Sequence, residues 1–201
     1  MIKKLNNKYF KKHPIKDISA AKITYNMTAV YDIDDLVNKT LDEGYKPKEE
    51  ELQLRDEILK EHDSEKLLKY MRKNLTLISR MELYYRILEH EEEMMPLIKK
   101  RAMTSMQDEF IENVIYFFIH CQEDCCDWIL QQYNNIRSEY LKSQLCLVLG
   151  HRGDISMIEF LMGEVKRFEN LHLDEDFEQG PILALQLIKD NYIYNKYEKL
   201  F

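Results

Sequence analysis

A short apolar pattern that returns about every thirty residues is the feature that most constrains the fold of this 201-residue chain. In each copy, four apolar residues surround one different central residue. The clear copies are residues 94–98 (MMPLI), 125–129 (CCDWI) and 157–161 (MIEFL), and a weaker copy is 67–71 (LLKYM). Their central residues lie 27, 31 and 32 residues apart. A period of this length accommodates two helices, so the sequence predicts a stack of helix pairs.

The spacing of apolar residues within each copy also indicates helices. From Pro47 onward, apolar residues recur at intervals of three and four rather than in alternation. Five Gly and four Pro are too few for the many tight turns of a β-sandwich or barrel. Pro47 and the acidic residues after it predict one helix start, and Asp63 predicts an N-cap for the next helix. We therefore expect an all-α fold.

Each clear copy is preceded by another apolar segment, at 84–88, 115–119 and 145–149. A polar connection separates the two segments, so the unit is helix, turn, helix. In the third unit, Gly150 or Gly153 is expected to end the first helix in the left-handed conformation. Asp154 is expected to cap the helix that follows. Residues 178–194 read as a last long helix that closes the stack.

The third unit, 148–154 (VLGHRGD) followed by 157–161, resembles the HEAT-like repeat of bacterial proteins, known as the PBS-lyase type. Units of that family commonly carry a Leu-Gly, a Gly-Asp and an apolar-Pro-x-Leu pattern. Pro96 occupies the proline position in an earlier unit, whereas Asp127 and Glu159 replace it later. The resemblance covers about residues 64–188. It implies an α-α superhelix, a HEAT/ARM-like solenoid of antiparallel helix pairs, in a family that includes scaffolds, binding modules and a few enzymes.

The domain organisation predicted from these patterns is simple. Residues 1–16 contain six Lys and no acidic residue, and they are expected to form a flexible basic tail. They lack the continuous apolar segment and the cleavage site of a secretory signal. Residues 17–201 are expected to form one solenoid domain, in which 17–46 cover the N-terminal end. The longest apolar stretch, 114–119, is far shorter than the ~20 residues of a membrane-spanning helix.

Sulfur and imidazole groups are the candidates for metal chemistry. Cys121, Cys125, Cys126 and Cys146 lie in apolar sequence, which favours buried thiols of a reducing compartment, and we expect a cytoplasmic protein without a cofactor. The first three could alternatively bind zinc, although the paired Cys-x-x-Cys pattern is missing. A second set recurs at intervals of 30 and 31 residues: His90, His120 and His151. Histidines at helix C-termini are favoured by the helix dipole, and a metal site is the alternative.

Positively charged residues at the ends of the second helices are the candidates for partner binding. In HEAT-like stacks, second helices usually line the concave face. The candidate contact residues are Lys99, Lys100, Arg101, Gln132, Tyr133 and Arg167. Glycine-rich phosphate loops, Gly-x-Ser-x-Gly elbows and His-Glu-x-x-His pairs are absent from the sequence. The leading hypothesis is thus a non-enzymatic scaffold that binds a protein partner along its concave face.

Two other functions remain open from the sequence. One is a metal-dependent enzyme or metal-binding protein that uses the histidines at the repeat turns. The other is weak nucleic-acid binding through the basic tail and the cations of the second helices. A formal net charge of −7 works against general affinity for nucleic acid.

Overall fold

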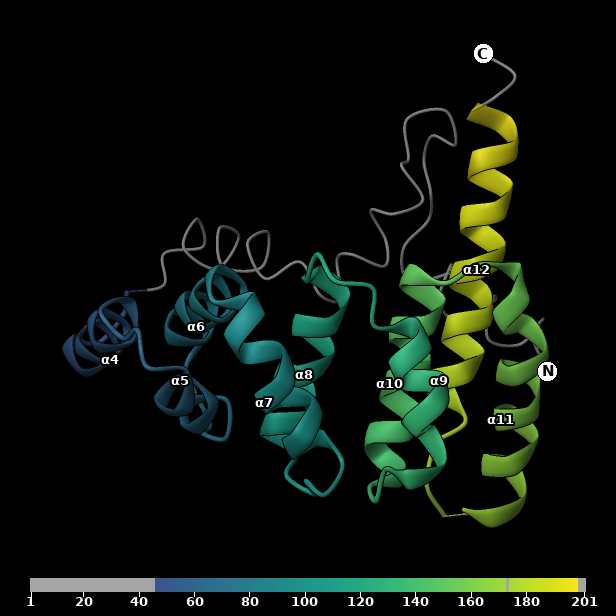
Figure 1. Cartoon of the computed structure of the whole chain (residues 1–201), viewed down its shortest axis with the longest axis horizontal. Coiled ribbons are helices and arrows are strands. Elements are labelled where there is room, and N and C mark those ends of the chain that lie inside the picture. Colours follow the sequence, from purple (N-terminus) through teal and green to yellow (C-terminus); the bar gives the residue numbers. More distant parts are fainter. Residues whose placement is uncertain (1–45, 173, 199–201) are drawn as a thin grey trace.

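The computed structural model describes residues 46–172 and 174–198 of the chain. These residues form nine α-helices and two short 3₁₀-helices, and no strand (Figure 1). This confirms the predicted all-α fold of packed helix pairs. The expected basic tail, and all of the expected N-terminal cover except residue 46, lie outside the described residues.

The helices follow one another with short connections. In chain order they are α4 (Glu49–Leu59), α5 (Ser64–Tyr70), α6 (Leu77–Glu89), α7 (Glu91–Ala102), α8 (Asp108–His120), α9 (Cys126–Gln132), η1 (Tyr133–Asn135), α10 (Glu139–Arg152), η2 (Ile155–Met157), α11 (Ile158–Leu171) and α12 (Gln179–Glu198). Helices α6, α8 and α10 start at intervals of 31 residues, as the sequence repeat predicts. We call α4, α6, α8 and α10 the first helices and α5, α7, α9 and α11 the second helices.

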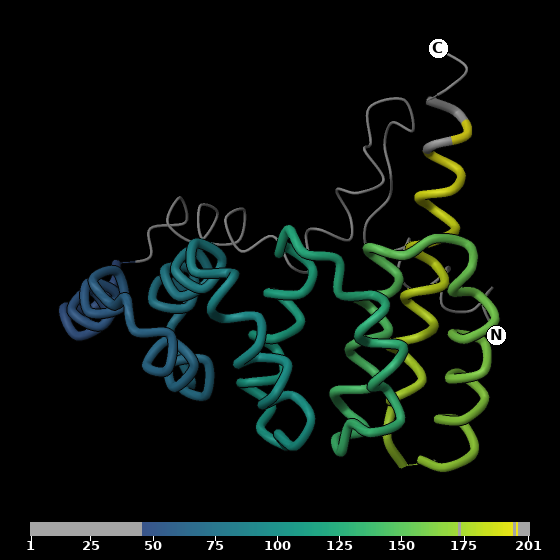
Figure 2. The backbone as a smooth tube through the Cα atoms, in the orientation of Figure 1, coloured from purple at the N-terminus to yellow at the C-terminus, as the bar shows by residue number. Residues whose placement is uncertain are grey.

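The first helices form one continuous layer. Helix α4 packs on α6, α6 on α8, and α8 on α10, while α12 packs on both α10 and α11. Among the second helices, α5 packs on α7. Figures 1 and 2 show the pairs following one another along the long axis of the molecule, from α4 at one end to α11 and α12 at the other. None of the helices in the described part of the chain is both long and apolar enough to cross a membrane.

Side chains connect each unit to the next at separations close to the repeat length. Ser64 Oγ donates to Glu93 Oε2 at 2.5 Å, 29 residues along the chain. The Glu91 carboxylate accepts from the backbone N–H of Gln122 at 2.7 Å. The rings of Tyr84 and Tyr116 stack with their centroids 3.7 Å apart. Such neighbour-to-neighbour contacts are typical of a quasi-one-dimensional repeat stack.

Short polar side chains begin several of the helices. Asp63 accepts hydrogen bonds from two backbone N–H groups in the first turn of α5, as predicted. Ser138 accepts from the N–H of Leu141 at the start of α10. Asp154 accepts from the N–H of Ser156 and so caps η2, which leads into α11. The predicted capping role of Asp154 is therefore confirmed for the 3₁₀ turn.

The predicted left-handed glycine at the end of α10 is wrong. Gly153 ends the helix with φ −81° and ψ −176°, which is an extended conformation, and Gly150 lies within the helix. The absence of a side chain at Gly150 serves packing instead. A Cβ there would lie 2.5 Å from the Cα of Ala184 on α12, closer than real contacts allow. Gly150 therefore lets α10 and α12 approach closely.

Candidate functional site

The six predicted contact residues lie at the C-terminal ends of α7 and α9 and on α11, and their surroundings differ sharply. Lys100 is exposed, while Arg101 and Gln132 are half-buried. Lys99 is half-buried as well: its Nζ lies 2.6 Å from Glu123 Oε1 and 5.6 Å from the centroid of the Trp128 ring. Lys99 therefore ties α7 to the connection before α9 and to α9 itself.

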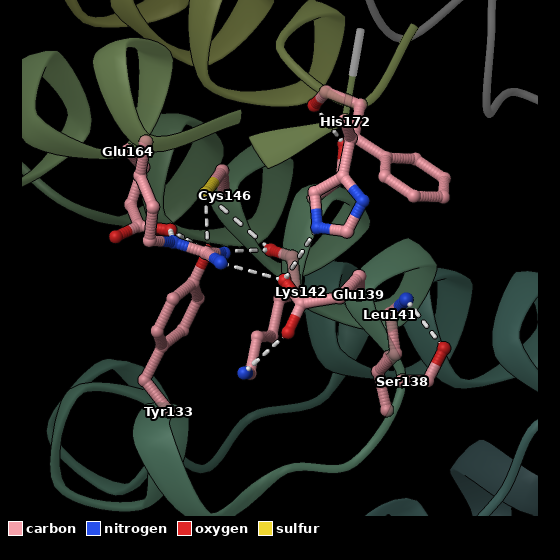
Figure 3. Close-up of polar contacts among 11 residues, drawn as sticks. Tyr133, Ser138, Glu139, Leu141, Lys142, Cys146, Glu164 and His172 are labelled. Carbon is pink, nitrogen blue, oxygen red and sulfur yellow. Dashed lines mark hydrogen bonds and ion pairs between the residues drawn. The ribbon is translucent and has the colours of Figure 1, made fainter. Parts of the chain in front are cut away.

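Tyr133 is only 1% exposed, so it offers no side-chain surface to a partner. Its hydroxyl donates to Glu164 Oε2 on α11 at 2.8 Å and lies 3.4 Å from Cys146 Sγ on α10. Figure 3 shows the Tyr133 ring pointing toward these two residues. Burial, Cys146 and Glu164 together raise the pKa of Tyr133, which keeps the hydroxyl protonated as a donor. The residue is therefore part of the junction between α10 and α11.

Arg167 belongs to the same junction. Its Nε donates to Glu164 Oε2 at 2.7 Å, and its Nη1 donates to Glu139 Oε2 at 2.7 Å. Lys142 Nζ donates to the other oxygen of Glu139 at 2.8 Å. Burial alone would raise the pKa of Glu139, but the hydrogen bonds from Lys142 and Arg167 outweigh it and lower that pKa. We call Tyr133, Glu139, Lys142, Glu164 and Arg167 the α10–α11 junction. Figure 3 shows Tyr133, Glu139, Lys142 and Glu164 of this junction.

The four cysteines are free and buried, which confirms that they pack in the core. Burial is the largest cause that raises the pKa of Cys126 to about 12 and of Cys146 to about 12. Cys121 differs from these two, because a hydrogen bond with Cys125 and the charge of Arg152 lower its pKa despite burial. Arg152 Nη1 lies 3.3 Å from the Cys121 sulfur.

Arg152 also satisfies the carbonyl groups that end α8. Its Nη1 donates to the carbonyl oxygens of Phe118 at 3.0 Å and Cys121 at 2.5 Å, and its Nη2 donates to that of Glu123 at 3.0 Å. A positive group at a helix C-terminus is stabilised by the helix dipole. Arg152 is thus a connection from the third unit back to the second, and the sequence alone does not distinguish it from a surface cation.

The three predicted histidines lie at the C-terminal ends of first helices, as the dipole interpretation requires. His90 separates α6 from α7, His120 is the last residue of α8, and His151 lies in the last turn of α10. Burial, His120 and Arg152 lower the pKa of His151. A further histidine, His62, lies in the connection after α4, and its ring centroid is 5.8 Å from that of His90.

The buried guanidinium of Arg86 lies between the rings of His62 and His90. Arg86 Nη2 lies 2.9 Å from His62 Nδ1 and 3.2 Å from His90 Nε2, and it donates to the carbonyl oxygen of Glu61 at 2.8 Å. A positive group in contact with both rings opposes a second cation there. Throughout residues 46–172 and 174–198, no group of three or more His, Cys, Asp or Glu side chains is arranged to hold a metal ion.

Four exposed cations lie where one unit connects to the next. Exposed side chains in or beside these connections are Arg72, Lys73, Lys100, Met106 and Arg137, which we call the basic loop edge. Two hydrogen bonds join its connections in space. Arg72 Nε donates to Gln107 Oε1 at 2.7 Å, and the backbone N–H of Arg137 donates to the carbonyl of Met103 at 3.1 Å. The connections after α5, α7 and η1 therefore form one edge.

Sequence reasoning identified Lys100 but missed Arg137 and Met106. Both lie in polar connections between helices, so their exposure follows from the predicted units. The contact between the connection around Met103 and that around Arg137 has no local sequence signal, because the chain geometry of two units creates it.

A scan of family models, a search of curated proteins and a search of solved structures found no match for this chain.

Proposed function

We propose that the protein is a non-enzymatic, HEAT-like repeat scaffold that binds an acidic protein partner along its second-helix side, at the basic loop edge. The observation that carries the proposal is that four exposed cations and the exposed side chain of Met106 lie in or beside three connections that two hydrogen bonds join. Cations interspersed with an apolar contact suit an acidic peptide segment that carries a hydrophobic side chain.

The burial and the ion pairs of the six contact residues predicted from the sequence favour the basic loop edge over that full set as the partner surface. Lys99 and Arg167 are engaged with acidic side chains of their own chain, and Tyr133 is buried. Lys100 is exposed, and the buried Nε of Arg101 makes no hydrogen bond within the described part of the chain. We therefore centre the proposed partner surface on Lys100 and extend it to Arg72 and Arg137.

The rigidity of the edge also supports a binding role. Arg72 and Lys100 lie beside or in helices that pack into the stack, and hydrogen bonds hold the connections to one another. A preorganised surface binds with a smaller entropy loss than a flexible one. Four buried thiols support our further proposal that the protein acts in the cytoplasm, where thiols stay reduced.

The test is a capture experiment on the tagged protein in nuclease-treated extract of its own source cells, followed by mass spectrometry. The wild type should retain a stoichiometric protein partner. Charge reversal of Lys100→Glu together with Arg137→Glu should weaken retention by at least about tenfold, because two attractive charges become repulsive. Lys189→Glu, at an exposed position on α12, is the matched control and should retain the partner. Equal retention by all three proteins contradicts the proposed surface.

A further inference from the structure

The outward side of α11 carries an apolar stripe that residues 46–172 and 174–198 leave exposed. Ile155, Ile158 and Met162 are 57%, 41% and 44% exposed, respectively. Their spacing of three and four residues places them on one side of the helix that begins in η2. The inward side of the same helix carries Leu161 and Phe168, which are fully buried. The stripe is therefore a second apolar side on one helix.

The repeat explains why Ile158, the middle residue of the stripe, is apolar. The positions equivalent to Ile158 in the two preceding units are Met95 and Cys126, and these are 3% and 5% exposed. Within the stack, this position is covered, whereas α11 lies at the end of the row of pairs (Figure 2). The last second helix thus presents a side of the kind that is buried in the units before it. Uncovered terminal sides of this kind favour association in repeat proteins.

Gly163 lies in the middle of α11, and a Cβ added there would meet nothing within 4 Å. The other two helical glycines behave differently. A Cβ at Gly150 would collide with Ala184, and one at Gly180 would collide with Ser143, both where α10 meets α12. Glycine in a helix interior costs stability, and at these two positions close helix approach explains it. Gly163 also lacks a side chain, but none of the helices in the described part of the chain packs against it.

Charged side chains complete the pattern on this side of α11. Glu159 and Lys166 are both exposed, and they lie at nearly equal distances on either side of the Met162–Gly163 midpoint. If two α11 helices cross antiparallel at this midpoint, Glu159 of each copy lies opposite Lys166 of the other. A parallel crossing would instead place like charges together. The stripe is therefore complementary to itself only in the antiparallel arrangement.

We propose that this side of α11 binds a second copy of the chain, with the two α11 helices antiparallel and crossing at the midpoint between Met162 and Gly163. Met162 of each copy packs on Gly163 of the other, and Ile158 is buried beside it. Two reciprocal ion pairs between Glu159 and Lys166 fix the register. The interface has two-fold symmetry.

The first test is the oligomeric state of the purified full-length protein, measured by sedimentation velocity from about 1 to about 100 µM. The wild type should form a dimer as concentration rises. Met162→Glu should remain monomeric, because it places two carboxylates against an apolar surface. Leu59→Glu changes an exposed apolar residue at the other end of the stack and should dimerise like the wild type. A wild-type monomer over the whole range overturns the proposal and leaves the stripe to a different protein.

The second test examines the antiparallel register. Glu159→Lys alone and Lys166→Glu alone should each weaken dimerisation by at least about tenfold, because each creates like-charge contacts twice. The double variant Glu159→Lys with Lys166→Glu should restore the wild-type dimer, because the pairs are exchanged. Circular dichroism checks that all variants remain folded. Single variants that dimerise like the wild type, or a double variant that fails to recover, overturn this arrangement.

Discussion

Tyr133 has a polar hydroxyl, but its side chain is almost fully buried and connects parts of the core. Its ring is buried, and its hydroxyl reaches Glu164 on the next second helix, 31 residues along the chain. Glu164 in turn accepts from Arg167. When a buried acceptor loses a hydrogen-bond donor, the fold is destabilised by the desolvation free energy that the hydrogen bond had offset. The side chains of the α10–α11 junction are therefore expected to matter for stability.

Removal of the Tyr133 hydroxyl should lower the free energy of unfolding. We expect Tyr133→Phe to cost about 1–2 kcal/mol, because Glu164 loses a buried hydrogen bond while the ring is retained. Urea unfolding followed by circular dichroism measures the change. Tyr192→Phe removes a hydroxyl from a side chain that is mostly exposed, so it should leave the stability unchanged. Equal stabilities for both variants would show that the junction contributes nothing.

The lowered pKa of Glu139 predicts how stability depends on pH. The folded state favours the carboxylate, so its stabilising effect is complete above the unfolded pKa of about 4.3 and is lost as the pH falls through the lowered folded value. Wild type should exceed Glu139→Gln in Tm near neutral pH, and the gap should close in acid. Glu169→Gln, at an exposed position, is the control. A gap that persists below the folded pKa would contradict this assignment.

At the scale of the element, Gly150 on α10 and Gly163 on α11 allow the effect of helix packing to be distinguished from the effect of helix propensity. Gly150 lies against Ala184, whereas Gly163 has no neighbour within 4 Å of the position of a Cβ. The same change, Gly to Ala, therefore has opposite expected effects. At Gly150 the methyl group collides with α12, and at Gly163 it only removes the flexibility of glycine from the unfolded chain and improves helix propensity.

We expect Gly150→Ala to destabilise the fold by about 1–3 kcal/mol and Gly163→Ala to stabilise the monomer by about 0.5–1 kcal/mol. Urea unfolding at a protein concentration at which the wild type is monomeric measures both effects. Each variant is the control for the other, since the chemical change is identical. Stabilisation by both substitutions would place α12 farther from α10 than the structure has it.

The sequence predicts helices well where apolar spacing and capping residues agree. Helix α4 begins at Glu49, shortly after Pro47, and helix α5 begins directly after the cap Asp63, because local chemistry determines these starts. The predicted helix end at Gly150 is wrong because its packing partner Ala184 is 34 residues away in the sequence, and no local pattern indicates this contact. Local signals thus indicate where helices begin, while close approach between helices depends on the assembled stack.

For the whole molecule, the thirty-residue repeat was enough to predict an all-α stack, because only neighbouring units need to match. The surface that we propose for partner binding was harder to predict. Lys99 and Arg167 have the composition of surface cations, but acidic residues of neighbouring elements engage both. Arg137 joins the basic loop edge through a backbone hydrogen bond to Met103, which depends on how two units stack. Charge type is visible in a sequence, whereas its pairing across units is not.

The central claim is that a protein partner binds the basic loop edge. Hydrogen–deuterium exchange of the protein with and without its captured partner tests this most directly. We expect binding to slow exchange at residues 72–76, 100–107 and 134–137 and to leave exchange in α12 unchanged. Protection confined to α12 or to the connections between first and second helices, with no change at these three segments, would contradict it.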